Sequence, residues 1–236
     1  MIALAYDVHG NLPALEAVVA DAREAGARRW ILGGDYALFG GWPAETVALL
    51  RELEPAVWIR GNGERWTANP DSAPGDDVVQ GAIAAAREAL GRELVDDLAS
   101  LPFSCPSDGM LICHGSPASD VRSFLPEPAD EEAELLEGVD APRVLFGHTH
   151  LPFARRSAVR GVELVNPGSV GMPFDGDARA AYALLHDDGR VEHRRVAYDH
   201  AASAARVRAH GGDWSQVVAE RVERARMDIQ GGSTRP

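Results

Sequence analysis

Five short apolar runs in the sequence each end in a side chain that can bind a metal ion, with glycine beside it. Carboxylate oxygens, amide oxygens and imidazole nitrogens are ligands for divalent metals. Strand ends at one edge of an open α/β sheet are where ligands bind, and glycine lets the backbone approach a bound group closely. The five segments therefore predict one shared metal site. In chain order they are Asp7-Val8-His9-Gly10, Gly34-Asp35, Gly61-Asn62, His114-Gly115 and Gly147-His148-Thr149-His150.

Two of these segments carry a pair of ligands separated by one residue. Side chains two apart on an extended chain point the same way, so Asp7 and His9 are expected to form a two-point clamp. His148 and His150 are expected to form a second one. A lone Gly-Asp is usually a turn and a lone histidine is usually structural, but five such segments in order are not expected from independent turns. The remaining histidines that we interpret as structural are His186, His193, His200 and His210.

The elements that would position these ligands alternate between strand and helix. Apolar runs at 2–6, 30–32 and 56–59 predict strands. A helix is predicted between Asn11, a plausible N-cap, and Gly26, and another at about 43–53. Short connections between them imply a parallel sheet with right-handed crossovers.

The rest of the chain predicts a second set of strands and further helices, with no repeat, linker or domain boundary. We therefore expect one domain over residues 1–236, with a loosely held tail from about 231. The expected elements are a loop at 67–77, helices at about 78–90 and 92–100, a hairpin at 103–114, a helix near 129–137, strands at 143–146, 153–157, 161–165, 180–186 and 190–197, and helices at 200–209 and 214–227.

Composition excludes several classes of function. The formal net charge of −13 argues against a protein that mainly grips nucleic acid or an anionic membrane. All 23 basic residues are arginine, which excludes a P-loop nucleotide site and Schiff-base chemistry. No apolar run is long enough to span a bilayer and no signal peptide is evident, so a cytoplasmic location is the expectation. Cys105 and Cys113 are interpreted as small buried hydrophobes.

The motif set resembles that of the calcineurin-like metallophosphoesterase superfamily. Asp7-x-His9, Gly34-Asp35, Gly61-Asn62, His114 and Gly147-His148-x-His150 match its motifs in order. With Asn166-Pro167-Gly168-Ser169, the chain is similar to the small bacterial and archaeal phosphodiesterase branch, over residues 7 to about 169. The resemblance implies an α/β fold, a four-layer αββα sandwich of two mixed sheets flanked by helices.

The resemblance also implies a ligand set for two divalent metal ions, which could be Mn, Fe, Zn, Co or Ni. Asp7, His9 and His150 would hold the first ion. Asn62, His114 and His148 would hold the second, and Asp35 would bridge the two. The reaction implied is hydrolysis of a phosphoester by in-line attack of a metal-bridging hydroxide. Asp35, Asn62, His114 and His148 are the predicted catalytic residues, and Asn62 and Arg65 the predicted substrate contacts.

The sequence departs from the family pattern at one position. In much of the superfamily a histidine that protonates the leaving group follows Gly-Asn, but here the residue is Gly63. Loss of a general acid costs about 10²–10⁴ in rate, and least when the leaving group is a weak base. We therefore expect a preference for aryl phosphodiesters or nucleoside polyphosphates. Restoring histidine at position 63 is expected to raise turnover most on poorly activated esters.

Several nearby residues have two interpretations. Arg65 would contact a substrate phosphate, or else pair with Glu64 or a surface acid. The loop aromatics could stack on a base or aryl group, but packing is the favoured interpretation, and the turn itself is favoured for Ser169. The loop aromatics are Tyr36, Phe39, Trp42 and Trp66.

Two other functions are kept as alternatives to a phosphoesterase acting on a small phosphoester. One is a metal-binding scaffold with the same fold and little turnover, which the missing histidine at position 63 mildly favours. The other is a nuclease, which the acidic composition disfavours. The sequence does not predict the oligomeric state.

Overall fold

Residues 1–227 are described in this computed structural model, and they contain two five-stranded sheets. The expectation of a loose tail from about 231 therefore lies outside the described residues. The first sheet has the strand order β10-β9-β1-β2-β3 and the second has the order β4-β5-β6-β8-β7. The strands are β1 (Ile2–Ala5), β2 (Arg29–Leu32), β3 (Ala56–Trp58), β4 (Ser104–Ser107), β5 (Met110–Cys113), β6 (Arg143–Leu145), β7 (Phe153–Arg156), β8 (Glu163–Asn166), β9 (Ala180–Leu185) and β10 (Val191–Val196).

Helices occupy the connections and both outer faces of the sandwich. The predicted break between the helices at 78–90 and 92–100 is present inside α4, where Gly91 has φ 72° and ψ 162°. The helix predicted near 129–137 is shorter than expected. The helices are α1 (Leu12–Glu24), α2 (Pro43–Arg51), α3 (Asn62–Ala68), a 3₁₀ turn η1 (Pro70–Ser72), α4 (Asp77–Ala99), α5 (Glu132–Leu135), α6 (His200–Arg208) and α7 (Asp213–Arg224).

Both sheets are mixed, as expected. In the first sheet, β1 pairs in parallel with β2 and β2 with β3, which confirms the predicted parallel core. β9 and β10 extend this sheet with antiparallel pairing. In the second sheet, β5, β6 and β8 run parallel, with β4 and β7 antiparallel at the edges.

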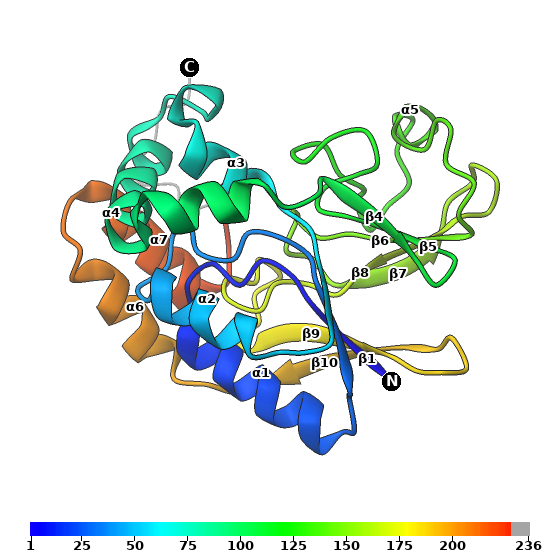
Figure 1. Cartoon of the computed structure of the whole chain (residues 1–236), viewed down its shortest axis with the longest axis horizontal. Helices are drawn as coiled ribbons and strands as arrows, with labels where there is room; N and C mark the ends of the chain where they lie inside the picture. Colours follow the sequence, from blue (N-terminus) through cyan, green and yellow to red (C-terminus); the bar gives the residue numbers. More distant parts are fainter. Residues whose placement is uncertain (228–236) are drawn as a thin grey trace.

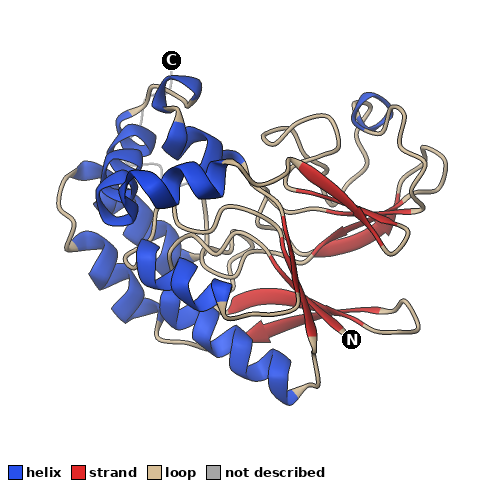
Figure 2. Ribbon diagram, in the orientation of Figure 1, coloured by secondary structure: helices blue, strands red, loops and turns tan. Residues whose placement is uncertain are grey.

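Three separate apolar clusters show that the layers follow the order predicted for an αββα sandwich. One lies between the first sheet and α1, and it includes Leu15 and Val18 from the predicted helix face. The second lies between the two sheets, where Leu4 packs with Ile112. The third covers the outer face of the second sheet with loops and α5. Figure 1 shows the two sheets stacked, with most helices on one side and α5 on the other, and Figure 2 shows how little helix covers the second sheet.

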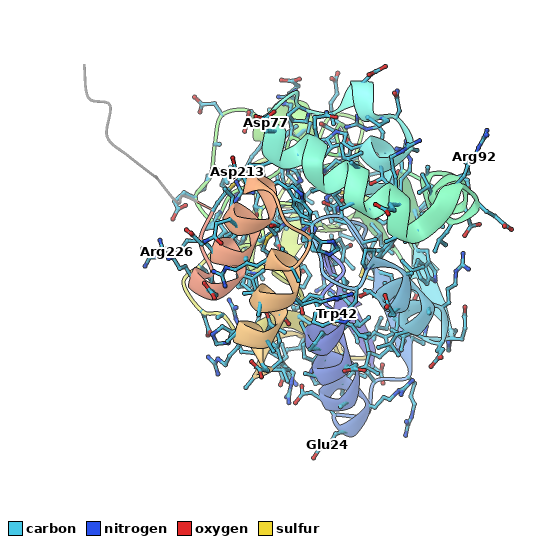
Figure 3. The ribbon with its side chains drawn as sticks, turned by 90° about the vertical axis from the view of Figure 1, so that its left-hand side faces the viewer. Glu24, Trp42, Asp77, Arg92, Asp213 and Arg226 are labelled. Carbon is cyan, nitrogen blue, oxygen red and sulfur yellow. The ribbon has the colours of Figure 1, made fainter. Side chains whose placement is uncertain are left out.

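The helical side brings together segments that are far apart in sequence. α7 packs against both α6 and α4, and α3 packs against α4. Figure 3 looks onto this side, where α4 runs from Asp77 past Arg92 and α7 begins at Asp213 beside it. Helix α3 begins directly after β3, at the edge of the first sheet where the predicted ligands lie. The helices α3, α4 and α7 therefore lie next to that edge.

The sequence does not predict helix α3, because Gly61-Asn62-Gly63 is expected only to end a strand and 67–77 to form a loop. Glycine is a poor helix former, which favoured that interpretation. The helix is started by Glu64, whose Oε2 accepts a hydrogen bond from the Gly61 backbone N–H at 2.7 Å. This contact satisfies a donor that a helix N-terminus otherwise leaves open. Asn62 is therefore the first residue of a helix rather than part of a free turn.

No helix within residues 1–227 is long and apolar enough to cross a membrane. Cys105 and Cys113 are both free thiols on the paired strands β4 and β5. Cys113 is fully buried, as interpreted from the sequence, whereas Cys105 is only partly so.

Candidate metal centre

The structure brings all seven predicted ligands together at one end of the sandwich. They follow β1, β2, β3, β5 and β6, which is the arrangement expected for strand ends of an open sheet. Six of them are buried, and His148 is intermediate in exposure. The buried six are Asp7, His9, Asp35, Asn62, His114 and His150.

Asp7, His9 and His150 form the first group of donors that could hold a metal ion. Oδ1 of Asp7 lies 3.5 Å from Nε2 of His150 and 4.0 Å from Nε2 of His9. The two Nε2 atoms face one another at 3.1 Å. These three atoms surround a space in which one cation would contact all of them.

Asp7, Asp35 and His114 form a second group, which shares Oδ1 of Asp7 with the first. Nε2 of His114 lies 3.5 Å from Oδ1 of Asp35 and 3.8 Å from Oδ1 of Asp7. The other oxygen of Asp35, Oδ2, lies 4.0 Å from Nε2 of His9 in the first group. The two oxygens of Asp35 therefore face the two groups, one each.

The amide of Asn62 and the ring of His148 complete this second group. Oδ1 of Asn62 lies 3.0 Å from Nε2 of His114 and 2.9 Å from Nδ1 of His148. An amide oxygen that faces other acceptors fits a cation between them. Without a cation, turning the amide over would satisfy the same atoms by hydrogen bonds, including one to the Asp120 carbonyl.

Hydrogen bonds to backbone carbonyls orient the rings of His9 and His150. In each ring Nδ1 points away from the centre and Nε2 points into it. Nδ1 of His9 contacts the Leu38 carbonyl at 3.0 Å, and Nδ1 of His150 contacts the Met172 carbonyl at 2.5 Å. A carbonyl can only accept, so Nδ1 of each ring carries a proton, and in the neutral form of each ring the lone pair of Nε2 faces the centre. Two lone pairs 3.1 Å apart repel each other, and a metal ion between them removes that repulsion. The donor set therefore fits a metal ion.

A buried oxygen without a partner supports the same fit. Asp7 is fully buried, and its Oδ1 has no hydrogen-bond partner. Its other oxygen, Oδ2, accepts a hydrogen bond from the His148 backbone N–H at 3.0 Å. A buried carboxylate oxygen left without a partner is costly unless it pairs or binds a metal.

The electric field at the centre favours positive charge. Burial opposes ionisation of Asp7, but three histidines, His150 first among them, outweigh it and hold the pKa of this carboxyl below its usual range. Burial also opposes protonation of His114, but Asp35 and Asp7 outweigh it and raise the pKa of that ring. The field that holds a proton on His114 would equally attract a metal ion.

Other ligands are shifted toward their neutral forms. Burial lowers the pKa of His9 to about 3, with the charge of His150 adding to the effect. Burial and the charge of His114 lower the pKa of His148 to about 4. Neutral imidazole is the form that binds a metal ion. Burial, together with the charges of Glu64 and Asp7, raises the pKa of Asp35 to about 7.

The backbone reaches the site in a different way from the one expected. β1 ends at Ala5, and Asp7 and His9 both have left-handed backbone, with φ of 53° and 50°. His148 and His150 also do, with φ of 67° and 58°. The paired ligands do converge, but the expected cause, alternation along an extended strand, was wrong. With Asp35 at φ 56°, five of the seven predicted ligands occupy a region that side-chain-bearing residues rarely adopt.

Glycines beside the ligands are required by space. A Cβ at Gly61 would lie 2.2 Å from Oδ1 of Asp35, and a Cβ at Gly147 would lie 2.6 Å from Oδ2 of Asp7. At Gly63 a Cβ would lie 2.9 Å from Oδ1 of Asp35, which also accepts the Gly63 N–H at 2.7 Å. Histidine at position 63 would therefore push against Asp35. This contact opposes the rise in turnover expected from a histidine at position 63.

Glu64 has a structural role that the sequence left unassigned. Its Oε2 accepts from the backbone N–H of Asp35 and its Oε1 from that of Tyr36, both at 2.8 Å. It accepts from Gly61 as well, so one buried carboxylate joins the turns after β2 and β3. The signal available in the sequence was an acid three residues after a glycine that begins a helix.

Arg65 pairs with an acid, as its second interpretation expects, but the acid is the buried Asp120 rather than Glu64 or a surface acid. Its Nε and Nη2 donate to the two carboxylate oxygens of Asp120 at 2.7 and 2.8 Å. Among the loop aromatics, Tyr36 is fully buried with its hydroxyl within hydrogen-bond distance of two backbone carbonyls, and Trp42 lies against the Arg206 guanidinium. Ser169 donates to the Asp7 carbonyl at 2.7 Å, so its turn supports the first ligand.

A cavity of about 760 Å³ opens directly onto the ligands. Its floor contains five of them, namely His9, Asp35, Asn62, His148 and His150. Phe39 and Trp66, for which packing was the favoured interpretation, line its wall. So does Phe174, which stacks on His150 with ring centroids 4.3 Å apart and was missed in the sequence.

Comparison with known proteins agrees with this geometry. Residues 1–190 match the model of the calcineurin-like phosphoesterase superfamily domain. The chain belongs to the calcineurin-like phosphoesterase superfamily. Members of the superfamily use divalent metal ions, so this calcineurin-like protein is a metal-dependent phosphoesterase. The resemblance inferred from the motifs is confirmed.

Relatives of this calcineurin-like chain include both solved and curated proteins. The crystal structure of a metallophosphoesterase from Sphaerobacter thermophilus superposes with a TM-score of 0.82 at 30% identity, covering 95% of this chain and 98% of that one. Phosphodiesterase YfcE of Escherichia coli is 28% identical over 78% of this chain and 86% of its own length. An uncharacterised protein of Methanocaldococcus jannaschii is 28% identical over 84% of this chain and 88% of its own length.

Proposed function

We propose that this chain hydrolyses small phosphodiesters with the help of two divalent metal ions. The observation that carries the proposal is the position of Asp35, whose Oδ1 lies 3.5 Å from Nε2 of His114 and whose Oδ2 lies 4.0 Å from Nε2 of His9 in the other group. A carboxylate in that position can bridge two ions. The open cavity above the same residues gives a substrate direct access.

In this proposal, each ion has three ligands of its own. The first is held by Asp7, His9 and His150, and the second by Asn62, His114 and His148, with Asp35 shared. Mixed imidazole, carboxylate and amide donors suit Mn²⁺, Fe, Zn²⁺, Co²⁺ or Ni²⁺. When bound, such a pair lowers the pKa of a water and neutralises charge on phosphoryl oxygens.

The chain's own residues position these groups and limit the substrate. Glu64 fixes the turns that carry Asp35 and Asn62 through three backbone N–H groups. Gly63, which lies against Asp35, offers no proton to a leaving group. We therefore expect hydrolysis to favour esters whose leaving group is already a weak base, such as aryl phosphodiesters.

The same observations disfavour the scaffold and the nuclease. A scaffold that holds metal without turnover would not need an open cavity onto the ligands. A nuclease would need a basic path for the phosphate backbone, and the net charge of −13 disfavours one. A small phosphoester is therefore the preferred partner.

The decisive experiment is a substrate panel assayed with and without Mn²⁺. It would contain bis-p-nitrophenyl phosphate, p-nitrophenyl phosphate, diadenosine tetraphosphate and single-stranded DNA. We expect metal-dependent hydrolysis of the diester to exceed that of the monoester. Metal content of the purified protein, measured by mass spectrometry, is expected to approach two ions per chain.

Asp35→Asn is the control variant, because it keeps the shape of the side chain and removes the charge that two ions would share. We expect it to lose most of the turnover and to bind fewer ions. Metal binding without turnover on any member of the panel would favour the scaffold. Preferential cleavage of DNA would favour the nuclease.

A further inference from the structure

The cavity above the ligands has a polar floor and an apolar wall. Beyond the five floor ligands, the wall includes side chains from α3, α4 and several loops. Next to the floor, Phe174 lies flat against His150, with 13° between the ring planes. The inner wall continues through Phe39, Trp66, Leu151 and Met172. A phosphoryl group at the floor would therefore have its substituents in contact with hydrocarbon.

The rim of this cavity holds every exposed large hydrophobic side chain found within residues 1–227. They are Val121, Leu125 and Met227, with exposed fractions of 42%, 44% and 59%. The first two come from the segment after β5 and the third from the segment after α7. Exposed apolar side chains that gather in one place mark a binding site, whereas scattered ones need no explanation.

The charges around the cavity do not suit a polyanion. Two arginines line it, Arg122 and Arg221, and Arg122 is engaged by both carboxylate oxygens of Glu134 at 2.6 and 2.9 Å. Asp76 and Glu131 line it as well. Several phosphates outside the floor would face these acids. A single phosphate at the floor would not.

We infer that the substrate is a monoanionic phosphodiester of an apolar alcohol, with an alkyl or aryl chain that runs from the ligands to the rim formed by Val121, Leu125 and Met227. This inference rests on the proposed function and narrows it. It removes the nucleoside polyphosphates that the sequence left open as substrates. Selectivity among substrates is determined by the apolar substituent on the phosphate and not by the charge of the substrate.

The test is a series of diesters with one leaving group and a growing second substituent. Methyl, butyl and hexyl p-nitrophenyl phosphate share the p-nitrophenolate leaving group, so chemistry at phosphorus is held constant. Each methylene that becomes buried is expected to raise kcat/KM up to about fourfold. Thymidine p-nitrophenyl phosphate, the nucleoside probe, is expected to fall below the hexyl ester.

The rim variants are Leu125→Ser and Met227→Ser, alone and together with Val121→Ser. Because these side chains are exposed, their replacement leaves the core intact. We expect the triple variant to lose the preference for the hexyl ester, with a larger fall in kcat/KM on the hexyl ester than on the methyl ester. Ala201→Ser, at an exposed position of α6 outside the cavity lining, is the control and is expected to keep the preference.

Binding measured without turnover gives an independent readout. In calorimetric titrations, dihexyl phosphate is expected to bind with a negative heat-capacity change, and the triple variant is expected to bind it more weakly. Equal kcat/KM across the alkyl series, or a preference for the thymidine ester, would overturn the inference and leave the proposed function standing. Failure to hydrolyse even the methyl ester with metal present would overturn the proposed function itself.

Discussion

The Glu64 side chain holds the backbone of Asp35 and leaves the Asp35 carboxylate untouched. Oε2 of Glu64 lies 2.8 Å from the Asp35 amide nitrogen. The same carboxylate accepts from Tyr36 and Gly61. Three N–H donors therefore share one buried acid. The orientation of the carboxylate proposed to bridge two ions depends on a neighbour that would itself bind none.

Glu64→Gln is expected to lower both the stability and the metal affinity of the protein. Glutamine has one acceptor oxygen, so its NH₂ group would face a backbone N–H donor. Leaving a buried donor unsatisfied costs about 1–3 kcal/mol. Urea unfolding measures the first effect and metal titration the second. Glu93→Gln, on the exposed face of α4, is the control and should change neither.

Substitution at Gly63 is expected to lower activity on every ester. Gly63→His adds a Cβ 2.9 Å from Oδ1 of Asp35 and 3.1 Å from its Cγ, so the carboxylate must shift. Gly63→Ala carries the same Cβ without the imidazole, and the two variants should be similarly impaired in kcat/KM. A histidine variant well above the alanine variant on alkyl esters would instead support the general-acid expectation drawn from the family pattern.

In the metal-free protein, Asp35 is expected to make stability fall as pH rises. Its folded pKa of about 7 lies above the ordinary aspartic acid value of 3.8. The protonated form is therefore favoured in the fold, so its contribution is fully present below about pH 4 and lost as pH rises through about 7. Each pKa unit between the folded and unfolded values of Asp35 corresponds to about 1.4 kcal/mol in the free energy of unfolding.

Comparison with Asp35→Asn isolates this effect from other pH-dependent contributions to stability. Relative to the wild-type protein, the variant should gain free energy of unfolding as pH rises from 4 to 7 in the presence of a chelator. The measurement is urea unfolding at several pH values. A difference that stays constant with pH would show that Asp35 is not shifted.

Arg65 and Asp120 are expected to act as a unit. If Arg65 acts only by pairing with Asp120, Arg65→Ala and Asp120→Ala should reduce kcat/KM by similar factors. The double variant should then have a kcat/KM no lower than that of either single variant. The corresponding coupling free energy is about 0.5–3 kcal/mol for residues in direct contact. A rise in KM from Arg65→Ala that persists in the Asp120→Ala background would instead place the arginine on a substrate phosphate.

The parts predictable from the sequence are those with a local signal. Apolar runs predict strands such as β1 and β2, and the expected gap between helices at 78–90 and 92–100 coincides with the break at Gly91. The convergence of Asp7 with His148 was predicted from the shared position of strand ends. These features depend on periodicity and on rules of sheet topology.

The parts that were not predictable depend on contacts between distant segments. Asp120 meets Arg65 across 55 positions, and Phe174 reaches His150 from a loop without a recognisable pattern. The helix α3 was hidden because Gly63 lowers helix propensity, while its start is secured by Glu64. No local pattern shows the left-handed backbone of His9, because tertiary contacts impose it.

The left-handed backbone at the ligands has a consequence for how this chain can change. Non-glycine residues in this conformation carry a cost of about 1–3 kcal/mol each. Glycine would relieve that cost at His9, His148 or His150, and would delete a donor in the same step. A protein of this fold that no longer needed to bind metal would therefore gain stability if these side chains were replaced by glycine. Their joint presence is what the proposed metal site requires and what backbone conformation alone would disfavour.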